Sequence, residues 1–256
     1  HMRHNAVKAK VLRGEAAIGA ELRIPSPELV EFYGLLGFEW ICINAEHGPI
    51  DWVTCQAMCR ACDARGLSSI VRVPTLDHSL IAKYLQAGAL GLAVPHINTA
   101  EQAEAVVQAA RYGPIGRRGS DWGSNRASDY GLLSAAHDYF ERANQELLIA
   151  IWIEEVQGMK NLDEILQVPG IDAVNFGAGD LSLSMGLAGR QDHPDVQAAI
   201  IEGRRKALAA GKVLIGEPTT ALAAKRQIAD GTLLISTNLT RMWEASGRAF
   251  LSELRG

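Results

Sequence analysis

The hydrophobic residues of the chain gather in eight short runs separated by amphipathic or polar segments. Within each run the apolar side chains are nearly continuous rather than alternating. This pattern is typical of strands buried on both faces, and therefore of parallel pairing with helical crossovers. The predicted strands are residues 18–22, 40–44, 69–73, 91–94, 148–154, 172–176, 213–216 and 233–236.

The segments between these runs carry signals for the start of helices. Ser26 precedes Pro27 and Glu28, which are typical of a first helical turn, and Thr99 forms a capping box with Gln102. A helix is therefore expected after each strand. Eight such units in about 250 residues match a (β/α)8 TIM barrel. No polar linker divides the chain, so we expect a single domain over residues 1–256.

Two segments do not fit this alternation of strands and helices. Residues 112–146 are rich in Gly, Arg, Ser and Asp and include a predicted extra helix near residues 133–143, which indicates a functional or intersubunit loop. His1-Met2 at the start resembles a scar of tag removal and is left out of the fold prediction.

Composition and charge exclude several classes of protein. A hydrophobic fraction of 48% and a charged fraction of 21% are typical of globular chains rather than disordered ones. The net charge of −4, with no block of like charge, predicts a small-molecule partner and neither nucleic acid nor anionic lipid. The longest apolar stretches span about seven residues, whereas about 20 are needed to cross a bilayer. The first residues lack a secretory signal, so the expected location is cytoplasmic.

Three of the four cysteines lie close together at Cys55, Cys59 and Cys62. This spacing also occurs in motifs that hold an iron–sulfur cluster. Here, however, the cysteines fall at positions i, i+4 and i+7 of a predicted helix, which favours a buried apolar stripe. The chain also lacks the cysteine pattern of a disulfide framework, so reduced thiols are expected.

Polar residues follow the predicted strands, where the active site of a TIM barrel forms. Glu154 and Asp180 follow neighbouring strands, which lie about 4.8 Å apart. Two carboxylates at this spacing suit a hard divalent cation such as Mg²⁺ or Mn²⁺. The alternative is that both acids only cap the helices that follow them. Gly177 and Gly179 allow the backbone to approach a ligand, and their N–H groups suit a carboxylate.

Two further strand ends carry candidate catalytic groups. His47 follows the second strand beside Glu46 and is a candidate general base, the alternative being a histidine that only hydrogen-bonds within its loop. Arg72 ends the third strand, where its guanidinium can stabilise an oxyanion or an enolate; the alternative is a salt bridge across the barrel mouth. His96 follows the fourth strand and also fits a simple turn.

Two other chemistries are not favoured by the sequence. A Schiff-base aldolase needs a lysine at an inner strand end, whereas the lysines considered fall in predicted helices or, for Lys212, before the seventh strand. Gly177 and Gly179 are followed by Ser182, so the dinucleotide fingerprint lacks its third glycine and nicotinamide is not expected. Any carbanion chemistry is therefore expected to be metal-assisted.

Over nearly its whole length the chain resembles the HpcH/HpaI family of class II 2-oxo-acid aldolases, whose best-known member cleaves 4-hydroxy-2-oxoheptanedioate. The segments that carry the resemblance are 37–40, 46–49, 71–74, 87–89, 94–96, 111–114 through 118–119, 153–154 with 160–162, and 177–182. The resemblance implies a metal-dependent lyase that joins pyruvate to an aldehyde, or splits the product, through an enolate. It also implies a hexamer, a trimer of dimers, in which the helix over residues 241–254 is exchanged.

Carried onto this sequence, the resemblance implies a role for each candidate. Glu154 and Asp180 are the expected ligands of Mg²⁺, Mn²⁺ or Co²⁺. His47 is the expected acid and base, and Arg72 the oxyanion stabiliser. The backbone at Gly179 and Asp180 is expected to bind the substrate carboxylate.

The chain departs from the family pattern around the substrate. Asn44 replaces an aspartate that partners the histidine, so His47 is expected to be a weaker base. Trp152, expected to contact substrate, replaces a glutamine, Glu21 replaces a tryptophan, and Gln86 replaces an aspartate. The residues expected to surround the catalytic groups are Asn44, Glu46, Gln86 and His96. Two alternatives stay open: a related lyase such as an oxaloacetate decarboxylase, and a non-catalytic oxo-acid-binding protein.

Overall fold

The strands of the protein form the predicted barrel. In the computed structural model, which describes residues 3–256, eight parallel strands close into a ring in chain order, so the (β/α)8 prediction is confirmed. The last strand pairs with the first, with Ile18 opposite Ile235. The strands are β1 (Ala17–Leu22), β2 (Trp40–Asn44), β3 (Ser68–Arg72), β4 (Gly91–Val94), β5 (Leu148–Ile153), β6 (Ala173–Phe176), β7 (Val213–Gly216) and β8 (Thr232–Asn238). His1-Met2, interpreted as a tag scar, lies outside the described residues.

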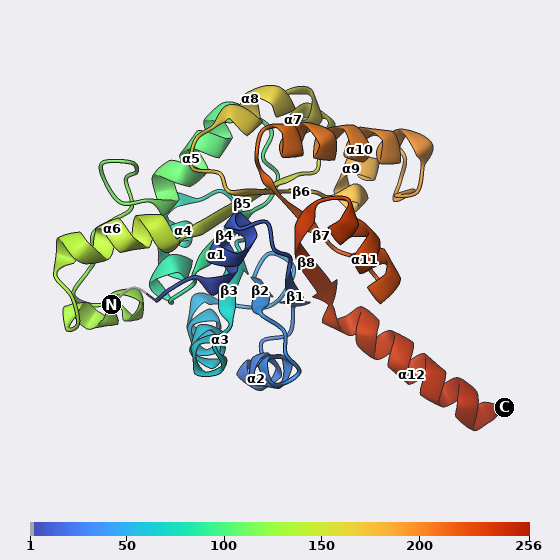
Figure 1. Ribbon diagram of the computed structural model, residues 1–256, viewed down its shortest axis with the longest axis horizontal. Helices are drawn as coiled ribbons and strands as arrows, with labels where there is room; N and C mark the ends of the chain where they lie inside the picture. The colour runs from blue at the N-terminus through green and yellow to red at the C-terminus, as the bar shows by residue number, and fades with distance from the viewer. Residues whose placement is uncertain (1–2) are drawn as a thin grey trace.

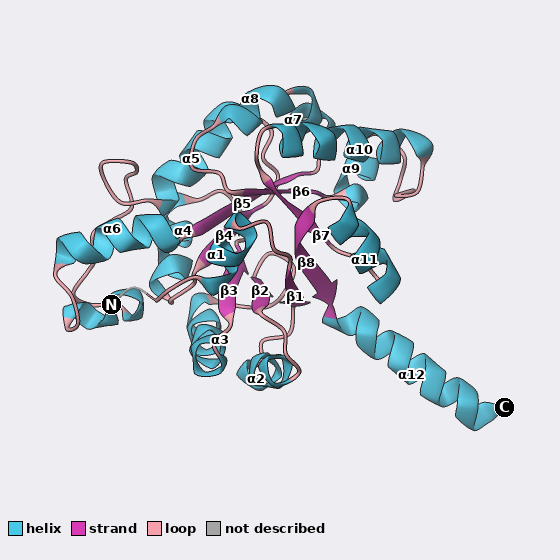
Figure 2. Ribbon diagram, viewed as in Figure 1, coloured by secondary structure: helices cyan, strands magenta, loops and turns pink. Residues whose placement is uncertain are grey.

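Helices surround this ring (Figures 1 and 2). The expectation of one helix per strand holds only in part, because β5 and β6 are each followed by two helices and the predicted insertion adds a 3-10 helix and an α-helix before β5. The helices are α1 (Ala6–Leu12), α2 (Pro27–Leu35), α3 (Trp52–Arg65), α4 (His78–Gln86), α5 (Ala100–Ala110), the 3-10 helix η1 (Arg126–Gly131), α6 (Ala136–Glu146), α7 (Val156–Lys160), α8 (Leu162–Gln167), α9 (Ala178–Ser184), α10 (Pro194–Ala209), α11 (Ala221–Ala229) and α12 (Leu239–Arg255).

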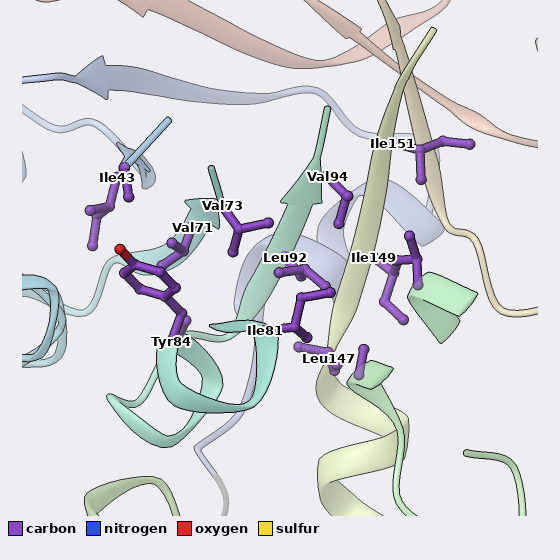
Figure 3. Packing of buried hydrophobic residues seen from close by; sticks show 14 of the residues in the cluster. Ile43, Val71, Val73, Ile81, Tyr84, Leu92, Val94, Leu147, Ile149 and Ile151 are labelled. Atoms are coloured by element: carbon purple, nitrogen blue, oxygen red, sulfur yellow. The ribbon is translucent and has the colours of Figure 1, made fainter. Parts of the chain in front are cut away.

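The outer layer of the core lies between the strands and the helices. Side chains of Val71, Leu92 and Ile149 point outward from adjacent strands and pack in one buried cluster with Ile81 and Tyr84 of α4 (Figure 3). Because alternate residues of a strand face opposite sides, the residues between them point into the barrel. Both faces of these strands are therefore apolar, which explains their nearly continuous hydrophobic runs.

The amino end of the barrel is closed by α1. Val7 and Val11 of this helix pack in the same buried cluster as the side chains inside the barrel, and Figure 1 shows α1 across the ring of strands. Asn5 caps α1, and its side-chain amide donates hydrogen bonds to the carbonyl oxygens of Leu90 and Glu146. With this end closed, the carboxyl ends of the strands are left to form the site.

The local signals seen in the sequence have the expected structures. Ser26 caps α2, and Thr99 with Gln102 forms the capping box of α5. The three clustered cysteines are free and fully buried along α3, as predicted for an apolar stripe.

The C-terminal helix α12 extends away from the barrel (Figure 1). Leu239 is its only buried residue, whereas Phe250 and Leu254 are 66% and 72% exposed. The helix therefore presents apolar side chains that its own chain does not cover. Among residues 3–256, no helix combines the length and apolar character needed to cross a bilayer.

We expect Asn5→Ala to destabilise the barrel end. The change removes the cap of α1 and leaves two carbonyl oxygens without their donor, so the free energy of unfolding should fall by about 2–4 kcal/mol. Urea unfolding followed by circular dichroism measures this. Gln145→Ala, at an exposed position of α6, is the control and should cost less than about 0.5 kcal/mol. Equal losses in the two variants would contradict the role given to α1.

Candidate active site

A cavity of about 950 Å³ opens at the carboxyl ends of the strands. Its wall includes His47 after β2, Arg72 at the end of β3, Trp152 and Glu154 at the end of β5, and Asp180 in the first turn of α9. The structure thus brings together, at one mouth, the residues that the sequence predicted as catalytic groups and metal ligands.

The guanidinium of Arg72 is the most closely held group at this mouth. Its side chain is only 5% exposed, forms an ion pair with Glu46, and places Nη2 3.5 Å from Oε2 of Glu154. The guanidinium carbon also lies 4.8 Å from the centre of the Trp152 ring. Burial alone would lower the pKa of Arg72, but the carboxylates of Glu154 and Glu46 outweigh it and raise that pKa above its usual value. Arg72 is therefore a fixed positive charge.

Glu154 is a buried carboxylate in the wall of the cavity. Its side chain is 1% exposed, and Oε1 accepts a hydrogen bond of 3.0 Å from the backbone N–H of His96. Burial raises the pKa of Glu154, while Arg72 and the His96 N–H oppose that rise. The carboxylate thus retains a cost of burial that a nearby cation would offset.

The turn after β6 passes unusually close to Glu154. A Cβ atom on Gly177 would lie 2.5 Å from Glu154 Oε2, so no larger residue fits at this position without a shift. This approach sets the first turn of α9, with Asp180, at the same cavity as Glu154. Within the described residues no cluster of three or more His, Cys, Asp or Glu side chains forms a metal site. Two carboxylates facing an open cavity fit a hard cation that takes its other ligands from substrate and water.

His47 is held by the backbone of its turn. The side chain of Asn44 accepts hydrogen bonds of 3.1 and 2.9 Å from the N–H groups of Glu46 and His47. The carboxylate beside the imidazole belongs to Glu46, whose Oε2 lies 3.6 Å from His47 Nε2. Asn44 thus contacts the backbone of the turn, where the sequence analysis expected residue 44 to act on the imidazole.

The two other residues expected around the catalytic groups lie in different places. His96 has a φ of 56°, and its imidazole lies among three carboxylates. Its Nδ1 is 3.0 Å from Glu155 Oε1 and 3.6 Å from Glu154 Oε1, and its Nε2 is 3.6 Å from Glu46 Oε1. Gln86 is the last residue of α4, which leads back to the amino end of β4. Gln86 is therefore at the end of the barrel opposite the cavity and does not join the other candidates in this chain.

Sequence reasoning missed most of one wall of the cavity. Asn175 of β6, Glu217 after β7 and Ser236 of β8 line it, together with Glu21 of β1, which the sequence analysis noted only as a replacement. Glu217 directly follows a strand, so the rule that found Glu154 also applies to it. Asn175 and Ser236 lie within strands, and their inward direction becomes known only from the register.

We expect Glu46→Gln to destabilise the protein by removing one charge that balances buried Arg72. The substitution keeps the shape of the side chain, and a lost charged contact of this kind costs about 1–3 kcal/mol. Urea unfolding measures the loss. Glu104→Gln, at an exposed position of α5, is the matched control. A stability equal to that of the control would show that Arg72 does not depend on Glu46.

Comparison with known proteins identifies the family of this chain. The model of the HpcH/HpaI aldolase/citrate lyase family matches residues 22–233. A 2-keto-3-deoxy-L-rhamnonate aldolase of Klebsiella pneumoniae is 39% identical over 208 residues, which cover 81% of this chain and 77% of that protein. A hydroxypyruvate/pyruvate aldolase of Cupriavidus necator is 35% identical over 95% of this chain and 89% of its own. The crystal structure of an HpcH/HpaI aldolase/citrate lyase family protein from Burkholderia cenocepacia superposes with a TM-score of 0.91 at 29% identity, covering 98% of this chain and 100% of that one. The chain therefore belongs to the HpcH/HpaI aldolase/citrate lyase family, whose members are metal-dependent class II aldolases and lyases of 2-oxo acids.

Proposed function

We propose that the protein reversibly cleaves 4-hydroxy-2-oxo acids to pyruvate, or a closely related 2-oxo acid, and an aldehyde. The observation that carries this proposal is the buried, permanently charged Arg72 in the same cavity as the carboxylates of Glu154 and Asp180. A fixed positive charge beside a pair of metal-ligand candidates suits a reaction in which negative charge develops on the oxygen of a 2-oxo group.

We assign Glu154 and Asp180 as the ligands of a divalent cation, with Mg²⁺, Mn²⁺ or Co²⁺ as candidates. A cation bound there supplies positive charge that polarises the 2-oxo group and stabilises the enolate. Lysines do not offer a Schiff-base route, because none of those in residues 3–256 lines the cavity.

The protein groups around the cation site hold the substrate. Arg72 donates an N–H to the 2-oxo oxygen, and its charge opposes the negative charge that develops there. The backbone N–H groups of Gly179 and Asp180, in the first turn of α9, bind the substrate carboxylate. Trp152 supports the guanidinium from one side and forms part of the cavity wall.

His47 moves the proton. In the cleavage direction the imidazole accepts the proton of the 4-hydroxyl group while the C3–C4 bond breaks. The electrons of that bond pass to the 2-oxo group as the enolate, and C4 leaves as the aldehyde. His47 then returns the proton to C3, which becomes the methyl group of pyruvate. Its side chain is 42% exposed, which leaves room for substrate beside it.

We further propose that the protein assembles as a hexamer, a trimer of dimers that exchange α12. The apolar side chains of α12 that its own chain leaves exposed, Phe250 and Leu254 among them, support this assembly. A neighbouring subunit that covers them would remove from water a face that is costly to expose.

Exchange of the methyl protons of pyruvate in D₂O tests the proposed reaction directly. Enolate formation requires no aldehyde, so chelator-treated protein should exchange these protons, as followed by NMR, only after Mg²⁺, Mn²⁺ or Co²⁺ is added. Asp180→Asn should lose both this exchange and the binding of Mn²⁺ measured by electron paramagnetic resonance. Absence of exchange in the unmodified protein with every ion would favour a decarboxylase or a binding protein.

The proposed exchange of α12 predicts a change in mass. Phe250→Glu combined with Leu254→Glu puts charge on the apolar face of the helix, so light scattering after gel filtration should show a smaller assembly than that of the unmodified protein. Glu253→Gln, on the same helix and exposed, should keep the original mass. An unmodified protein with the 27.6 kDa mass of one chain would refute the assembly.

A further inference from the structure

One wall of the cavity is polar and has no part in the proposed enolate chemistry. Glu21, Asn175, Glu217 and Ser236 line it, and we call these four residues the polar wall. They come from β1, β6, β8 and the residue after β7. Strand β6 pairs with β7, β7 with β8, and β8 with β1. The polar wall is therefore one continuous side of the barrel mouth, in the same cavity as Arg72.

Two carboxylates give this wall its negative charge. Glu21 is buried, and its Oε1 accepts hydrogen bonds of 2.6 Å from Arg23 and 3.2 Å from the side chain of Asn238. Glu217 is exposed to the cavity, yet the surrounding protein limits its hydration and raises its pKa. The negative charge of Glu21 adds to that rise, whereas Arg72, Arg23 and the neighbouring side-chain amide of Asn175 oppose it. The two glutamates thus lie near enough to repel each other.

Two buried groups of the polar wall have hydrogen-bonding capacity that the protein does not use. Ser236 Oγ has no hydrogen-bond partner within residues 3–256, and Asn175 Nδ2, which lies beside Glu217, makes no hydrogen bond of normal geometry there, although these residues are only 4% and 5% exposed. Asn175 is also opposite Trp152 in the pairing of β5 with β6, and Trp152 stacks against Arg72. The Asn175 amide is therefore close to the end of the cavity where the 2-oxo acid is proposed to bind.

We infer that the polar wall binds the hydroxylated tail of the aldehyde substrate, and that the protein selects aldehydes with hydroxyl groups beyond the reacting carbon. This inference rests on the proposed function. A hydroxyl group both donates and accepts, so it can donate to Glu217 and accept from Asn175. An alkyl, a carboxylate or an ammonium tail satisfies only part of this wall.

The competing tails each leave part of the wall unsatisfied. An alkyl tail pairs with neither the carboxylates nor the amide, and leaving buried polar groups unpaired is costly. A carboxylate tail pairs with Asn175 but meets the charges of Glu21 and Glu217. An ammonium tail pairs with the glutamates but leaves the amide donor of Asn175 unpaired. Within residues 3–256, four arginines besides Arg72 also line the cavity: Arg23, Arg190, Arg204 and Arg241. A carboxylate tail that reaches one of these guanidinium groups is the competing outcome of the test.

A comparison of three aldehydes tests the inference in the unmodified protein with saturating pyruvate and Mn²⁺. Glyceraldehyde carries two hydroxyl groups, propanal has the same carbon chain without them, and succinic semialdehyde carries a carboxylate. We expect kcat/KM for glyceraldehyde to exceed the values for both others by about tenfold or more, because hydrogen bonds to buried groups would be lost with each of them.

Two variants of Glu217 separate hydrogen bonding from charge. Glu217→Leu should reduce the glyceraldehyde-to-propanal ratio of kcat/KM by about tenfold, because it removes the acceptor. Glu217→Gln should keep most of that ratio but raise the relative activity on succinic semialdehyde, because it removes the charge. Glu104→Gln on the surface of α5 should change neither ratio. The ratio of the kcat/KM values for two substrates does not depend on the fraction of the protein that is folded, so a partly unfolded variant still gives a valid comparison.

The outcomes distinguish this inference from the proposed function. Protein that exchanges the protons of pyruvate but uses propanal or succinic semialdehyde as well as glyceraldehyde overturns the inference and leaves the proposed function standing. The same holds if the Glu217 variants keep the ratios of the unmodified protein. Protein that neither exchanges these protons nor forms product with any aldehyde overturns both.

Discussion

The arrangement of the site depends on one buried charge, the guanidinium of Arg72. A cation removed from water is stable only when it is paired, and Arg72 pairs with the carboxylates of Glu46 and Glu154. Glu46 follows β2 and Glu154 follows β5, whereas Arg72 ends β3. The ion pairs of this one guanidinium therefore connect the ends of three strands at the mouth of the barrel. The same carboxylates fix the direction of the guanidinium, which suits a group that must meet an oxyanion without first rearranging.

The rest of the fold holds these strand ends in place and leaves one opening. The helix α1 closes the amino end of the barrel with Val7 and Val11. At the opposite end, Gly177 lets the turn after β6 pass close to Glu154, so a short helix with Asp180 in its first turn borders the same cavity. A side chain at position 177 would displace that turn. The candidate cation ligands are therefore placed together by a close backbone approach and by the pairing of neighbouring strands.

Much of this was predictable from the sequence, because barrel strands are apolar on both faces and their carboxyl ends meet at one mouth. That rule located all eight strands and grouped His47, Arg72, Glu154 and Asp180. The contacts of particular side chains were not predictable. Whether Asn44 meets an imidazole or a backbone N–H depends on the shape of one turn, and the inward direction of Asn175 depends on register. Gln86 shows the converse, since a helix that runs back along the barrel carries its last residue to the far end.

We propose that Arg72, held by two carboxylates, stabilises the enolate oxygen of a 2-oxo acid. Oxalate is planar and resembles the enolate of pyruvate in shape and charge, so its affinity reports on this contact without turnover. Isothermal titration of oxalate in the presence of saturating Mn²⁺ is the most direct measurement. We expect Arg72→Lys to bind oxalate at least about tenfold more weakly, because an ammonium cannot reproduce the planar, paired geometry of the guanidinium. Equal affinity of the unmodified protein and the variant for oxalate would show that the guanidinium of Arg72 does not bind the enolate oxygen.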